Sequence, residues 1–95
     1  MNEVAMMRAR IVISGRVQGV YFRASARDVA RVRRLSGWIR NRRDGDVEAV
    51  VEGEEDAVQA FLAWCHDGPT GAHVTAVQVA REPYTGEFHD FRVVG

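Results

Sequence analysis

The sequence has no lysine and only one cysteine, Cys65. A single cysteine excludes an internal disulfide and leaves no cysteine pair for a metal site. No apolar run is long enough to span a membrane, and the first residues include Glu3 and no apolar stretch of signal-peptide length. We therefore expect a cytoplasmic protein without a membrane partner, with residues 1–7 as a flexible segment and residues 8–95 as one domain.

The net charge is zero, but the charges are unevenly distributed along the chain. From Arg8 to Arg43 there are eleven arginines and one acid, Asp28, whereas Asp44 to Gly95 has two arginines and eleven acids. A cationic region on a neutral chain favours an anionic ligand. The alternative is a solvated helix face rich in arginine. Because an all-arginine set of basic residues is typical of a GC-rich genome, a lone arginine carries little information.

The periodicity of apolar residues predicts an alternation of strands and helices. The predicted strands are 8–14, 38–43, 46–52, 74–80 and a short one at 91–94, and the predicted helices are 22–35 and 54–66. Two split βαβ units in the order β-α-β-β-α-β predict a ferredoxin-like α+β sandwich, an antiparallel sheet with both helices on one face.

Each predicted helix has one apolar stripe. The stripes consist of Phe22, Ala26, Val29 and Val32 in the first helix, and of Val58, Phe61, Leu62 and Cys65 in the second. This pattern assigns Cys65 to the core rather than to a nucleophile. No two histidines have the spacing of metal ligands, so we expect no metal site.

The hairpin between residues 38 and 52 has two possible registers around Asp44-Gly45. A three-residue loop would place Arg40 opposite Glu48 and Asn41 opposite Val47, so that charges pair on one face and apolar residues on the other. This register leaves Asn41 as the one polar residue on the apolar side. Its amide either bonds to the turn backbone or has a functional task.

The segment from Gly15 to Tyr21 connects the first strand to the first helix. A loop at a helix N-terminus presents several backbone N–H groups to an anion, and its two glycines allow close approach. Arg23 follows in the first helical turn, where its planar guanidinium can bind the same anion. As a pattern, G-x-x-x-G alone is not specific.

The groups that this loop lacks narrow its chemistry. The sequence has no G-K-[ST] motif, no cysteine in the loop and no carboxylate cluster nearby. N–H groups, an arginine and an amide can stabilise charge and orient water, but they offer no acid for a poor leaving group. We therefore expect the substrate to be a phosphate with a good leaving group such as a carboxylate, that is, an acyl phosphate.

Two long motifs resemble one known family. GRVQGVYFR, Gly15 to Arg23, resembles the acylphosphatase signature G-x-V-Q-G-V-x-F-R, and GWIRNRRDGDVE, Gly37 to Glu48, resembles the second signature G-[FW]-V-x-N-x-x-D-G-x-V-E, with Ile39 for the usual valine. The resemblance covers about 8–94. It implies hydrolysis of acyl phosphates to a carboxylate and inorganic phosphate, without a metal, a cofactor or a phosphoenzyme.

The resemblance also implies a role for each matching residue. Arg23 would clamp the phosphate and Asn41 would orient the attacking water. The phosphate oxygens would bind the backbone amides of Gly15, Arg16, Val17, Gln18, Gly19, Val20 and Tyr21. Gln18 and Phe22 are expected to shape and pack the loop. Arg42 stands where the family often has a small hydroxyl residue, and we expect it to pair with Asp46.

Other interpretations stay open at this point. One is a non-catalytic anion- or RNA-binding ferredoxin-like domain, although the first predicted strand lacks the aromatics that stack bases in such modules. Another is a domain of a larger carbamoyl-transfer maturation protein, but the absence of residues beyond Gly95 favours a free-standing enzyme. A third is a member that has lost its activity. We expect a monomer, and the sequence leaves the acyl group unidentified.

Overall fold

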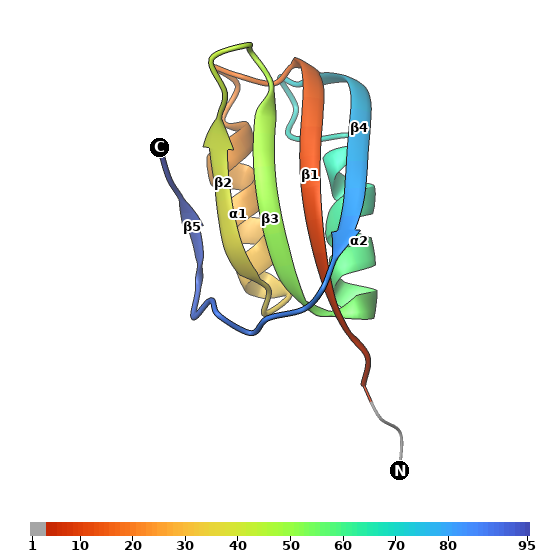
Figure 1. Ribbon diagram of the computed structural model, residues 1–95. Helices are drawn as coiled ribbons and strands as arrows, with labels where there is room; N and C mark the ends of the chain where they lie inside the picture. Colours follow the sequence, from red (N-terminus) through yellow and green to blue (C-terminus); the bar gives the residue numbers. More distant parts are fainter. Residues whose placement is uncertain (1–3) are drawn as a thin grey trace.

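Two helices pack against one face of a five-stranded sheet (Figure 1). The computed structural model describes residues 4–95. Its elements are β1 (Met6–Arg16), α1 (Phe22–Val32), β2 (Ser36–Asn41), β3 (Val47–Glu54), α2 (Glu55–Cys65), β4 (His73–Glu82) and β5 (Phe91–Val93). The strand order across the sheet is β4-β1-β3-β2-β5. This arrangement confirms the ferredoxin-like α+β fold.

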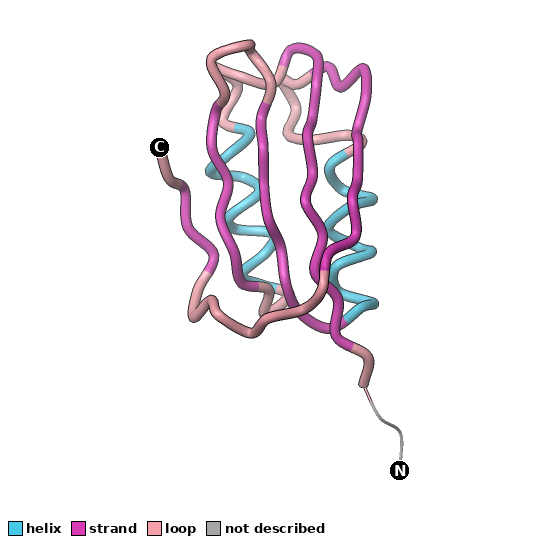
Figure 2. The backbone as a smooth tube through the Cα atoms, viewed as in Figure 1, coloured by secondary structure: helices cyan, strands magenta, loops and turns pink. Residues whose placement is uncertain are grey.

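The fifth strand differs from the expectation of a purely antiparallel sheet. β5 lies at the edge and pairs in parallel with β2, while the other neighbouring strands pair antiparallel. To reach that edge, residues 83–90 run from β4, at one edge of the sheet, to β5, at the opposite edge (Figure 2). This crossing sets the direction of β5, because the chain enters β5 at the end where β2 begins.

The sheet begins earlier in the chain than the sequence predicts. β1 starts at Met6, which pairs with Glu54, and Met7 is 5% exposed in the core. The prediction of a flexible segment over residues 1–7 is therefore wrong for Met6 and Met7. Residues 1–3 of that segment lie outside the described residues. The long antiparallel partner β3 extends the pairing beyond the alternating pattern that begins at Arg8.

The core lies between the sheet and the two helices. The stripe predicted for α2 is buried throughout, and burial raises the pKa of the Cys65 thiol to about 12. In α1, however, Val32 is 85% exposed and Ala30 is buried instead. A spacing of four residues from Phe22 through Ala26 keeps one face on the sheet, so Ala30 and not Val32 continues it. Among the described residues, no helix has the length and apolarity to cross a membrane.

The hairpin of β2 and β3 has the predicted register. Ile39 pairs with Ala49, Arg40 with Glu48, and Asn41 with Val47. The turn closes with the Arg42 N–H donating to the Asp46 carbonyl at 2.8 Å. The charged pair Arg40–Glu48 lies on the face without helices, so Asn41 points with Ile39 toward the helix side.

Arginine–carboxylate pairs cover much of the face opposite the helices. Glu48 accepts from Arg10 at 2.8 Å and from Arg40 at 3.0 Å. Both guanidiniums also flank Trp38, at 5.8 and 5.9 Å from its ring. Opposite charges from the two halves of the chain therefore meet on this face, which shields the buried central strand β3.

Glu52 joins this face to the segment between β4 and β5. Its carboxylate is fully buried and accepts hydrogen bonds from the Thr85 N–H and hydroxyl, the Gly86 N–H and Arg8. Burial raises the pKa of Glu52, but these hydrogen bonds outweigh it and hold the pKa below its usual value. The ionised carboxylate thus fastens the crossing segment to the sheet.

We expect Glu52→Gln to lower the free energy of unfolding at pH 7 by about 1–3 kcal/mol, because it weakens charge-assisted hydrogen bonds in a buried site. A lowered folded-state pKa contributes stability above the unfolded pKa of about 4.3, and that stability disappears as pH falls through the folded value. The difference between wild type and variant should therefore be constant above about pH 5 and shrink below it, as urea titrations at several pH values would measure.

The control is Asp67→Asn, which neutralises an exposed carboxylate after α2. Its unfolding free energy should stay close to that of wild type across the same pH range. If the difference in unfolding free energy between wild type and Glu52→Gln stayed the same at low pH, it would contradict the assignment of ionised Glu52 as the group that fastens the segment.

Candidate active site

The predicted phosphate loop and Asn41 lie at the same end of the sheet. β1 and β2 are both antiparallel to β3, so their carboxyl ends coincide. The segment after β1 and the turn after β2 therefore adjoin at one end of the molecule (Figure 1). The N-terminus of α1 begins at this end, beneath the side of the sheet toward which Asn41 points.

The two positions in this segment require glycine for different structural reasons. Gly15 has a φ of 123° beside a register shift against β4, and a Cβ there would overlap the carbonyl oxygen of His73. Gly19 has a φ of 75°, but a Cβ there would meet open space. Gly15 thus allows β1 and β4 to lie close together, whereas Gly19 supplies a left-handed turn that faces outward.

The backbone between Val17 and Ala24 leaves its donors unused. Among the turn and loop hydrogen bonds of residues 4–95, none has an N–H of residues 17–24 as its donor. Tyr21 precedes the helix with a φ of 62° and gives no side-chain cap, and the first turn of α1 has no acid. Strained backbone and uncapped N–H groups of this kind are able to bind an anion.

Gly15 and Arg16 belong to β1 rather than to the open part of the loop. They pair with Val74 and His73 of β4. The segment outside the strand is therefore residues 17–21, shorter than the range from Gly15 to Tyr21 predicted for phosphate binding.

Gln18 attaches the loop to the hairpin turn. Its Nε2 donates to the carbonyl oxygens of Arg42 at 2.8 Å and Asp46 at 2.9 Å. On the other side of the loop, Phe22 is 1% exposed and packs 5.3 Å from the ring of Trp64. These contacts fit the loop-shaping and packing roles expected for Gln18 and Phe22. They hold the loop between the hairpin turn and the core.

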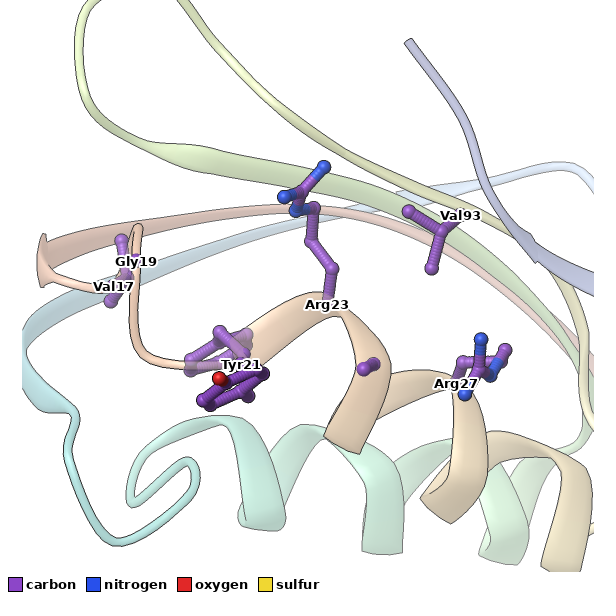
Figure 3. A pocket seen from close by; sticks show the side chains of 8 residues that line it. Val17, Gly19, Tyr21, Arg23, Arg27 and Val93 are labelled. Atoms are coloured by element: carbon purple, nitrogen blue, oxygen red, sulfur yellow. The ribbon is translucent and has the colours of Figure 1, made fainter.

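Arg23 projects from the first turn of α1 into a pocket of about 440 Å³ (Figure 3). The guanidinium points away from the helix, between the loop residues Val17 and Gly19 and the β5 residue Val93. Arg23 makes none of the ion pairs formed among residues 4–95. Its charge is therefore available to a ligand in the pocket.

Asn41 carries an acceptor without a partner. Its Oδ1 is buried and has no hydrogen bond among the described residues. The alternative in which this oxygen bonds to the turn backbone is therefore wrong. A buried amide oxygen without a donor is costly in a folded protein, which favours a functional reason for it. Asn41 is not among the residues that line the Arg23 pocket.

Arg42 does not pair with the Asp46 carboxylate, as the sequence predicts, but with Asp44 at 2.9 Å. The Asp44 carboxylate also accepts from the Asp46 N–H at 3.0 Å, which tightens the turn. This backbone hydrogen bond and the charge of Arg42 hold the pKa of Asp44 below its usual value. The tight three-residue turn brings Asp44 to the Arg42 guanidinium.

The pocket includes three residues that the sequence did not identify as part of the site, namely Ala24, Arg27 and Val93. Arg27 lies four residues after Arg23, and Val93 comes from β5. The spacing of Arg27 could have indicated a shared helix face with Arg23. Nothing in the sequence indicated that Val93 reaches the site, because its position depends on the parallel pairing of β5 with β2. Within residues 4–95, no group of three or more histidine, cysteine or acidic side chains is arranged to hold a metal.

Comparisons with known proteins match this chain to one family over nearly its whole length. The model of the acylphosphatase family matches residues 9–93. An acylphosphatase of Roseiflexus sp. (strain RS-1) is 56% identical over 89 residues, which cover 94% of this chain and 96% of that protein. The crystal structure of acylphosphatase from Bacillus subtilis matches with a TM-score of 0.90 at 38% identity, covering 94% of this chain and 99% of that one.

A longer protein contains a similar unit. Full-length HypF, in the phosphate- and nucleotide-bound form, is 28% identical and matches with a TM-score of 0.84. The match covers 99% of this chain but only 12% of the HypF chain.

The geometry of the two glycines predicts unequal costs for alanine. We expect Gly19→Ala to lower the free energy of unfolding by about 1–2 kcal/mol, the cost of left-handed backbone for a residue with a Cβ. Gly15→Ala should cost about 3 kcal/mol or more, because the clash with His73 adds to the backbone strain. Urea denaturation of both variants measures this ranking, and an equal or reversed order would contradict it.

Proposed function

The chain belongs to the acylphosphatase family and hydrolyses acyl phosphates, and we propose that Arg23, Asn41 and the loop amides carry this reaction. The products are a carboxylate and inorganic phosphate. One observation supports this assignment most. Three kinds of group that have no partner within residues 4–95 lie at the same end of the sheet: the backbone donors of the loop, the Arg23 guanidinium and the Asn41 amide oxygen.

The phosphoryl group binds at the loop. The N–H groups of Val17 to Tyr21 donate to its oxygens, and the dipole of α1 adds favourable potential at the same place. Gly15 and Arg16 complete the predicted range and hold the start of the loop against β4. Arg23 binds the same phosphoryl group with its guanidinium and offsets the charge on the equatorial oxygens.

Asn41 orients the attacking water. Its Oδ1 accepts a hydrogen bond from the water, whose oxygen forms a bond to phosphorus as the bond from phosphorus to the acyl oxygen breaks. The carboxylate leaves with the electron pair, and the proton of the water passes to phosphate or solvent. Because a carboxylate is a weak base, it leaves without a general acid, and the charge-stabilising groups suffice without a metal.

The proposed partners are the acyl phosphate and inorganic phosphate, with the protein acting as a monomer in the cytoplasm and binding no nucleic acid. Trp38 supports the last point. It is the aromatic on the face where RNA-binding domains of this shape stack bases. The guanidiniums of Arg10 and Arg40 flank its ring and are themselves bonded to Glu48.

The first test is hydrolysis of benzoyl phosphate, followed by ultraviolet absorbance in EDTA, by wild type and Asn41→Ala. We expect wild-type turnover to survive EDTA and the variant to lose about 10²- to 10³-fold in kcat, as for other groups that act on developing charge. Thermal unfolding should show no loss of stability, because the removed oxygen has no partner within residues 4–95.

This combination separates a catalytic role for Asn41 from a structural one. Near-normal turnover by Asn41→Ala would remove the water-orienting role, and inhibition of wild type by EDTA would contradict the metal-free reaction. A folded wild type that does not hydrolyse benzoyl phosphate would contradict the mechanism as a whole.

Arg23→Ala should have a larger effect than Asn41→Ala, because it removes phosphate binding as well as charge stabilisation in the transition state. We expect a fall of more than about 10³-fold in kcat/KM, together with a weaker inhibition by inorganic phosphate. The control is Arg33→Ala, which removes an exposed arginine just after α1. Equal effects of the two arginine variants would mean that general positive charge, not Arg23, attracts the substrate.

A further inference from the structure

The pocket around Arg23 extends beyond the place assigned to the phosphoryl group. Gly19 and Val17 of the loop form one end, Arg23 stands in the middle, and Arg27 and Val93 form the other end (Figure 3). With the phosphoryl group at the loop, the pocket gives the acyl group of a substrate room to extend toward Arg27 and Val93. This end of the pocket is therefore the part that distinguishes one acyl phosphate from another.

We propose that Arg27 forms an anion subsite for the acyl group, so that the enzyme favours acyl phosphates whose acyl part carries a second negative charge. This proposal rests on the function proposed above, because it needs the phosphoryl group at the loop. The ligand class is an acyl phosphate with a carboxylate or a phosphate a few bonds from the reacting carboxyl group.

The spacing of the two arginines fits such a substrate. Residues four apart on a helix are neighbours on one face, with about 6 Å between them along the axis. Arg23 and Arg27 line the same pocket with Ala24 between them. A short acyl chain can therefore reach from a phosphoryl group on Arg23 to a carboxylate on Arg27. Within residues 4–95, the one ion pair of Arg27 is with its exposed neighbour Asp28, at 3.2 Å, and solvent weakens this contact.

The location of both arginines is unfavourable for the helix itself. Arg23, in the first turn of α1, opposes the helix dipole, and its charge repels the like charge of Arg27 four residues later. The first turn of α1 has no acid to compensate, whereas α2 has Glu55 and Asp56 in its first turn. A local arrangement that lowers helix stability is expected where a ligand of opposite charge binds.

Val93 gives this end of the pocket an apolar wall. The residue is 37% exposed and is held at the site by its pairing with Ile39 of β2. In Figure 3, Val93 and Arg27 lie on the same side of Arg23. The carbon chain of an acyl group can pack on Val93 while its distal anion meets the Arg27 guanidinium.

The test compares two substrates that differ only in a distal anion, 3-carboxybenzoyl phosphate and benzoyl phosphate, and takes the ratio of their kcat/KM values. We expect the ratio to fall about fivefold in Arg27→Gln, the effect of a partly exposed ion pair, and to fall in wild type as salt is raised. The control Arg33→Gln, also at an exposed arginine of the same region, should keep the wild-type ratio.

A charge reversal strengthens the test. Arg27→Glu should lower the ratio of kcat/KM for 3-carboxybenzoyl phosphate to that for benzoyl phosphate further than Arg27→Gln does. This variant should also favour the cationic 3-(aminomethyl)benzoyl phosphate over benzoyl phosphate, whereas wild type should favour benzoyl phosphate of these two. An unchanged ratio in both Arg27 variants, with benzoyl phosphate still hydrolysed, would overturn the subsite and leave the proposed function intact. No hydrolysis of either substrate by a folded wild type would instead contradict the proposed function.

Discussion

Backbone N–H groups without an internal partner are the constraint on which the rest of this molecule depends. The segment 17–24 can keep its donors free only if other contacts hold it in shape. Gln18 attaches it to the hairpin turn, and Phe22 anchors it in the core. Just before the segment, Gly15 allows the end of β1 to lie close to β4. The fold around the loop thus supplies the stability that the loop itself gives up.

The arginines of the first half of the chain serve two purposes. Arg8, Arg10 and Arg40 bind carboxylates on the sheet face opposite the helices, so much of the apparent cationic surface is neutralised. Arg23 and Arg27 lie on the other side, in the first turn and the middle of α1. A count of positive charges along the sequence therefore overstates the field at the surface. In the mechanism we propose, the few arginines beside the loop are the ones that act on a substrate.

The register of β2 and β3 was predictable because cross-strand charges agree with only one loop length, and that register also identified Asn41 as an isolated polar side chain. The signature residues likewise identified Arg23 in the site. Features that depend on distant contacts were not predictable. The parallel pairing of β5, and with it the position of Val93, results from a segment that crosses the sheet and docks on buried Glu52. The exposure of Val32 depends on how α1 rotates against the sheet.

The crossing segment between β4 and β5 also has a consequence for how the molecule becomes active. Val93 reaches the pocket only after the chain has passed β4 and turned back beside β2. A nascent chain on the ribosome can therefore form the loop and helix α1 early, yet its pocket gains an apolar wall only when nearly all described residues have emerged. The end of the pocket at Val93 is therefore completed later in synthesis than the end formed by the loop and the first turn of α1.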